Sequence, residues 1–234
     1  MRDRASSTAS QLTRSNGASS RFFSIISGVI LALSVWGFSD NLIWNIGQPS
    51  NKDPKFILHG AFCLAWMILF FVQANLIRSG NPRIHRKLGI AGFLIAIGVV
   101  VTTLFVFWSV WRGWAAMPYY VKANRILFAG FVLLTILAYT YRHRPDWHKR
   151  LLLVGTLYLL EPILSRAFDP IEFMLTGLSD AQIGFYWTVF FAVTWNALFL
   201  SLAVHDFRTR RRLHNVSVFG YLAFLAVWPV ALLS

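Results

Sequence analysis

Ionisable side chains stand inside long apolar runs of this sequence, where they are costly unless paired or hydrated. Glu161 is followed by Pro162, which frees a backbone carbonyl and kinks a helix. Tyr158 and Ser165 lie about one turn to either side, so one polar stripe could face the interior of a helix bundle. Glu161 could therefore carry a proton or bind a ligand, or it could form a structural ion pair with Arg125 or His59.

Three further residues belong with Glu161 as candidates for ligand binding. Arg125 could hold an anionic or carbonyl-bearing ligand, or it could snorkel to lipid headgroups. His59 begins a polar and aromatic stripe at helical spacing, and it could be a haem ligand, a proton relay, a ligand contact or a hydrogen-bonded core histidine. Together with Asn196, these residues predict a polar pocket in the outer half of the bundle.

Two short stretches share the pattern P-x-x-H-[KR]-[KR]-L-x-x-x-G and place His85 and His148 at equivalent positions. Histidines at one depth on two helices could be the axial ligands of one b-type haem, with His205 as a substitute partner. We prefer the alternative that the basic residues beside them hold anionic lipid headgroups, because haem ligands usually lie deeper in a span. Those basic residues are Arg86, Lys87, Lys149 and Arg150.

Other signatures of chemistry are missing from the sequence. It contains no phosphate-binding glycine loop, no dinucleotide-binding fingerprint, no H-E-x-x-H and no zinc spacing of cysteine and histidine. No catalytic residue is identifiable from a motif, and enzymatic work on a lipid or isoprenoid, with Glu161 as the acid, stays open.

The composition indicates whether these residues lie in a soluble protein or in a membrane protein. The chain has 234 residues, of which 56% are hydrophobic and only 13% charged, and its mean hydropathy is +0.56. A soluble chain carries about 25% charged residues, so this composition excludes an ordinary soluble domain. The net charge of +13 does not indicate nucleic-acid binding, because the basic residues fall in short clusters between apolar runs.

Seven apolar segments are each near the ~20 residues that a helix needs to cross a bilayer. They cover residues 22–38, 56–77, 88–110, 119–141, 151–168, 183–204 and 216–233. None shows the alternation of barrel strands, so we expect an all-α, polytopic membrane protein.

The basic residues predict how the segments are oriented. The N-terminal tail and the loops after the second, fourth and sixth segments carry four Lys or Arg each. This bias predicts a cytoplasmic N-terminus and a multi-pass protein of the cell (inner) membrane. Residues 1–21 would be a disordered basic tail and residues 22–234 one transmembrane domain. Cleavage of the first segment as a signal peptide would leave six helices.

The repeated loop motif also suggests an internal duplication. Its two copies are offset by 63 residues, which spans two helices and two loops. This offset predicts that the second and third helices match the fourth and fifth.

The same motifs carry a resemblance to a known group. The first stretch contains residues 58–60, Trp66 and Gln73, and then H-R-K-L-G, which begins at His85. The second stretch contains H-K-R-L, which begins at His148, and then Pro162 and Arg166. This pattern, across residues 57–168, resembles a group of bacterial multi-helix membrane proteins without an assigned activity. The resemblance implies a bacterial membrane protein and adds no chemistry.

These observations leave three functional hypotheses. The first is a binding or transport module for protons or a small amphiphile, such as a quinone or lipid. The second is an electron-transfer protein with one b-type haem. The third is a non-catalytic accessory subunit of a larger membrane complex, whose partner would be a membrane protein or a second copy. Anionic lipids at the cytoplasmic face are expected partners in all three, and nucleic acid in none.

Overall fold

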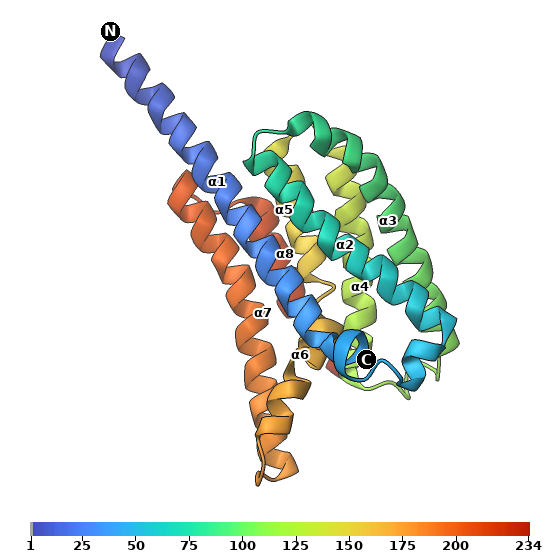
Figure 1. The fold of residues 1–234 in the computed structure, drawn as a ribbon. Helices are drawn as coiled ribbons and strands as arrows, with labels where there is room; N and C mark the ends of the chain where they lie inside the picture. The colour runs from blue at the N-terminus through green and yellow to red at the C-terminus, as the bar shows by residue number, and fades with distance from the viewer. Residues whose placement is uncertain (1) are drawn as a thin grey trace.

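The computed structural model describes the backbone of residues 2–234 and the side chains of residues 19–234, and this part of the chain is helical without a strand (Figure 1). A π-helical turn, η1 (Asp40–Trp44), and a 3₁₀ turn, η2 (Pro49–Lys52), link the first two helices. The helices are α1 (Arg2–Gly37), α2 (Pro54–Arg78), α3 (Pro82–Ser109), α4 (Tyr119–Thr140), α5 (Pro145–Leu157), α6 (Glu161–Met174), α7 (Asp180–Arg210) and α8 (Asn215–Leu233).

The helix boundaries follow from local sequence. Proline lies in the first turn of α2, α3, α5 and α6, where its fixed φ suits a helix and no backbone donor is lost. Ser179 and Gln182 form a reciprocal capping box at the start of α7. Gly80 adopts a φ of +75° between α2 and α3, which a residue with a Cβ rarely does.

Six helices are long and apolar enough to cross a membrane, which confirms six of the seven expected segments. They are Ser19–Gly37, Pro54–Arg78, Pro82–Ser109, Tyr119–Thr140, Asp180–Arg210 and Asn215–Leu233. The expected segment 151–168 is not one continuous helix. It is divided between α5 and α6, which are bent by 52° relative to each other and qualify as a span only together.

The N-terminal segment differs from the expectation in its backbone. α1 begins at Arg2, whereas we expected no regular structure before residue 22. The side chains of residues 1–18 lie outside the described part of the chain. The division into a tail and a transmembrane domain stays a prediction.

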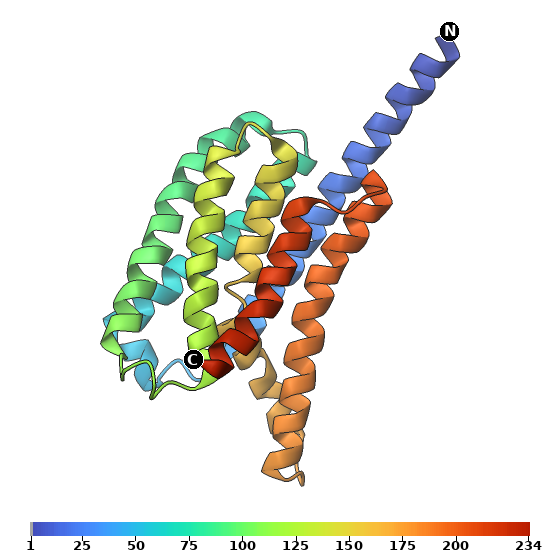
Figure 2. The ribbon, with the colours of Figure 1, turned by 180° about the vertical axis from the view of Figure 1, so that it is seen from behind.

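The helices form two hairpins, α2 with α3 and α4 with α5, beside a group made by α1, α7 and α8 (Figures 1 and 2). α1 packs against α2, α6 and α7, and α8 packs against α4 and α5. The loops that connect α2 to α3, α4 to α5 and α7 to α8 lie at one end of the bundle, the upper end in Figure 1, which we call the basic end. The two hairpins contain the two copies of the loop motif, and their common origin stays a prediction.

The core lies where α5 meets α4, α7 and α8. Trp195, Phe131, Leu157 and Leu202 are fully buried there. The outward faces are also apolar: on α3, for example, Ile90 is 71% exposed. Contiguous exposed apolar surface of this kind is not tolerated in water and suits a lipid environment.

Candidate functional site

The chain breaks its helical path between α5 and α6. α5 ends at Leu157, and Pro162 lies in the first turn of α6. Proline has no N–H to donate to the preceding turn. The backbone between the two helices instead forms hydrogen bonds between residues three apart, as in a 3₁₀ turn. Leu159 N donates to Thr156 O at 3.1 Å and Leu160 N donates to Leu157 O at 3.3 Å. The kink expected from Pro162 is present, as a break rather than a smooth bend.

Side chains from two neighbouring helices hold this break in place. Trp195 of α7 donates from Nε1 to Leu157 O at 2.8 Å, and it is fully buried. Trp66 of α2 donates from Nε1 to Thr156 Oγ1 at 3.2 Å. Each of these bonds satisfies a polar atom near the broken helix, which in an apolar surrounding would otherwise be costly.

Tyr158 fixes the break against two further helices. Its hydroxyl donates to Gly220 O on α8 at 2.7 Å. Its ring packs against Gly130 on α4, where an added Cβ would lie 2.7 Å from the ring carbons. The absence of a side chain at Gly130 is therefore what lets the ring occupy this position.

Glu161 is the first residue after the break and is buried, with 9% of its surface exposed. Its Oε2 accepts a hydrogen bond from Asn124 Nδ2 at 2.9 Å. Among residues 19–234 it forms no ion pair, either with Arg125 or with His59. The structure thus surrounds one carboxyl group with apolar core and gives it a neutral partner.

Arg125 follows Asn124 on α4 but contacts different residues. Its guanidinium lies over the rings of Phe107 at 4.5 Å and Trp111 at 5.8 Å. Its Nη1 is 3.5 Å from Val121 O, and its buried Nε has no hydrogen-bond partner among the side chains and backbone that the structure describes. Successive helical residues point about 100° apart, which explains why Asn124 contacts Glu161 and Arg125 does not.

His59 and Asn196 also have other partners. His59 Nδ1 lies 3.4 Å from Thr102 Oγ1. Asn196 Oδ1 accepts a hydrogen bond from Tyr221 at 2.6 Å. The contacts of Glu161, Arg125, His59 and Asn196 therefore do not join these residues into the single pocket that the sequence suggested.

The two loop histidines do meet. The rings of His85 and His148 lie 6.3 Å apart and nearly perpendicular at the basic end. His148 Nδ1 donates to Ala138 O at 2.9 Å, which leaves Nε2 as its free nitrogen. His85 Nδ1 is buried and has no hydrogen-bond partner within residues 19–234, and Gln73 Nε2 donates to His85 O at 3.2 Å. Two imidazoles from two helices are a donor set that suits axial ligation of haem.

His205 lies apart from this pair. Its ring stacks on Phe22 of α1 with 4.2 Å between centroids, and Nε2 is 3.4 Å from Ser19 Oγ. The contacts of His205 with α1 give no support to it as a substitute ligand. Among the described residues, no three His, Cys, Asp or Glu side chains gather in a way that could hold a metal ion.

The structure corrects the interpretation of Arg150 as a headgroup contact. Its side chain is 1% exposed and forms an ion pair with Asp206, which is fully buried. Arg150 Nε lies 2.9 Å from Asp206 Oδ1, and Ser217 Oγ donates to Asp206 Oδ2 at 2.6 Å. Arg150 thus joins α5 to α7 and α8 inside the bundle, because its carboxylate partner and its burial leave no access to lipid.

The other three expected headgroup contacts are more accessible. Arg86 and Lys87 are exposed at the start of α3. Lys149 donates to Ser19 Oγ at 2.8 Å and lies 3.2 Å from Asp146. Lys149 therefore already has protein partners, whereas Arg86 and Lys87 retain the exposure that lipid binding requires.

Sequence reasoning missed Asp206. It is the only acidic residue between positions 181 and 234, and it stands at the basic end of an apolar helix. A lone carboxylate beside so many cations was a signal that it pairs with one of them. His214 is part of the same cluster: its Nδ1 caps α8 by accepting from Val216 N at 3.1 Å. Burial, with the nearby Arg150 and Arg210, lowers the pKa of His214 to about 4.

No protein-family model, curated protein or solved structure matches this chain.

Proposed function

We propose that this chain is a multi-pass protein of the cell (inner) membrane that binds or transports protons, or a small amphiphile such as a quinone or lipid. Six apolar helices support the membrane location. The clustering of the basic loops at one end supports a cytoplasmic basic end and a cytoplasmic N-terminus.

The observation that carries the proposal is Glu161 at the break between α5 and α6. Broken helices in membrane proteins occur where the backbone is buried in protein or lines a binding site. A buried carboxyl with one neutral partner, Asn124, can take up and release a proton, because the uncharged form costs far less to bury than the charged form. Glu161 is therefore the proton-carrying group, and Asn124 positions it.

Infrared spectroscopy of the purified protein in mild detergent tests this role directly. The carbonyl band of a protonated carboxyl group should be present and should disappear as the pH is raised. It should be missing from Glu161→Gln and kept in Glu172→Gln, a matched change at an exposed glutamate of the same helix. An identical titrating band in the wild type and Glu161→Gln would overturn the proposal.

A second candidate is electron transfer through one b-type haem, and the meeting of His85 and His148 favours it. Bound haem would supply a one-electron couple, and the bond from His148 to Ala138 O would orient its ligating nitrogen. A spectrum of protein purified from haem-replete cells, reduced minus oxidised, decides this candidate. A split haem band that is lost in His148→Ala supports it, and a flat wild-type spectrum excludes it.

A further inference from the structure

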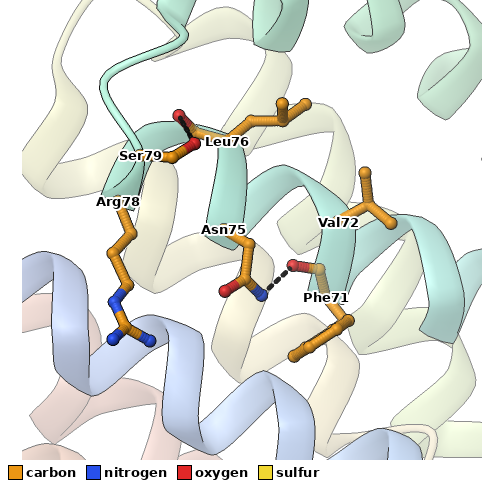
Figure 3. A pocket seen from close by; sticks show the side chains of 6 residues that line it. All are labelled: Phe71, Val72, Asn75, Leu76, Arg78 and Ser79. Carbon is orange, nitrogen blue, oxygen red and sulfur yellow. Dashed lines mark hydrogen bonds between the residues drawn. The ribbon is translucent and has the colours of Figure 1, made fainter.

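A groove lies on α2 where this helix runs beside α1 near the basic end (Figure 3). Its volume is about 450 Å³. It is lined by residues from the C-terminal part of α2 and by the residue that follows the helix, namely Phe71, Val72, Asn75, Leu76, Arg78 and Ser79.

Hydrogen bonds between α1 and α2 set the position of the charged group in this groove. Arg78 Nη1 donates to Ser24 Oγ of α1 at 3.3 Å, and Ser24 Oγ donates to Asn75 Oδ1 at 2.7 Å. Asn75 in turn donates from Nδ2 to Phe71 O at 2.8 Å. Figure 3 shows Asn75 and Arg78 extending together toward α1. The guanidinium is therefore oriented by the buried Ser24, which Asn75 holds in turn, although the Arg78 side chain itself is exposed.

Arg78 retains the capacity to bind an anion. A guanidinium has five N–H donors, and the contact with Ser24 uses one of them. Among residues 19–234, the ion pairs formed by Asp and Glu do not include Arg78. Three other cations at the basic end, Lys149, Arg150 and Arg210, do have such partners.

The groove also has an apolar part, formed by Phe71, Val72 and Leu76. Phe71 lies seven residues, about two turns, before Arg78 and therefore on the same face of α2, closer to the middle of the helix. A cation at the end of an apolar span, with an apolar wall directed toward the span's centre, matches a phospholipid in both charge and length.

We propose that this groove binds one anionic phospholipid, with its phosphate on Arg78 and an acyl chain along Phe71. The clustered cations of the basic end favour an anionic over a zwitterionic lipid. The inference rests on the proposed position of the bundle in the membrane and does not involve Glu161.

Native mass spectrometry in mild detergent, with added phosphatidylglycerol, tests the site. The wild type should retain one phosphatidylglycerol more tightly than the others. Loss of a bidentate charge-assisted contact in Arg78→Gln should weaken retention about tenfold. Ser24→Ala should weaken it less, because the charge stays but loses its orientation. Arg83→Gln is the matched control, since Arg83 is exposed in the first turn of α3 and should not contribute.

Three outcomes would overturn the inference. The first is equal retention by Arg78→Gln and Arg83→Gln. The second is phosphatidylcholine held as tightly as phosphatidylglycerol, which would remove the anionic preference. The third is inorganic phosphate competing as well as the lipid, which would assign the groove to a free anion. Because the readout is lipid retention, failure here would leave the proton chemistry of Glu161 untouched.

Discussion

At the scale of single residues, the buried pair of Arg150 and Asp206 is the contact on which the basic end depends. Two charges have been removed from solvent, and they are compensated by each other and by Ser217 and His214. Removing one partner of such a pair leaves the other charge buried without compensation. The interaction of α5 with α7 and α8 should therefore be sensitive to either residue.

The variant Asp206→Asn is expected to lose about 3–5 kcal/mol of stability. For a chain of this size that corresponds to a fall in Tm of roughly 10 °C, measured by thermal unfolding in mild detergent. Asp146→Asn is the control. Asp146 also lies 3.4 Å from Arg150, but its side chain is 53% exposed, so water can replace its contacts with Arg150, Lys149 and Arg210. Equal Tm values for the two variants would show that the buried pair stabilises the fold no more than the exposed pairs of Asp146 do.

His214 gives the basic end a predictable pH dependence. Its pKa is about 4 in the folded protein, against an ordinary value of 6.5. The unfolded chain therefore binds more protons between these values, so stability is full above pH 6.5 and falls as the pH decreases toward 4. Thermal unfolding between pH 7.5 and 4.5 measures this slope. His214→Asn keeps a helix-capping side chain without a titratable ring and should reduce the slope; an unchanged slope would contradict this role.

At the scale of helices, the break between α5 and α6 is the feature that positions Glu161. The bend is fixed by contacts from outside the broken helix, namely Trp195, Trp66 and the hydroxyl bond of Tyr158. Pro162 explains why the helix stops here, and these contacts explain why it resumes in a particular direction.

Gly130→Ala tests the contact between α4 and Tyr158. The new methyl group would lie 2.7 Å from the Tyr158 ring, so the ring must move and its bond to Gly220 must weaken. We expect a loss of about 1–3 kcal/mol from this overpacking. Gly89→Ala, where a Cβ meets nothing within 4 Å, should be neutral or stabilising. Equal Tm values in detergent would contradict the close packing of this helix pair.

Most helices could be predicted from the sequence, and the contacts between them only in part. Hydropathy locates six spans because each is an apolar run of sufficient length. Pro162 indicated the bend, and the repeated motif singled out His85 and His148, whose rings lie 6.3 Å apart. The pairing of Glu161 with Asn124, and of Arg150 with Asp206, depends on which helix faces which, and no periodicity within one helix encodes that.

At the scale of the whole molecule, the basic loops predict the orientation of the bundle in the membrane. In a Cys63→Ala background, His143→Cys would lie at the basic end and Thr176→Cys in the loop between α6 and α7 at the opposite end. A membrane-impermeant maleimide added to intact spheroplasts should label Thr176→Cys and not His143→Cys, because the proposed orientation places the basic end in the cytoplasm. The reverse pattern of labelling would contradict the proposed orientation.

The measurement that tests the central claim most directly is proton flux through the protein reconstituted in lipid vesicles that contain a pH-sensitive dye. Under an imposed membrane potential, the wild type and Glu172→Gln should acidify the vesicle interior. Glu161→Gln should fall to the level of protein-free vesicles, because the buried carboxyl at the helix break would be gone. Proton influx at the wild-type rate in Glu161→Gln would contradict the account.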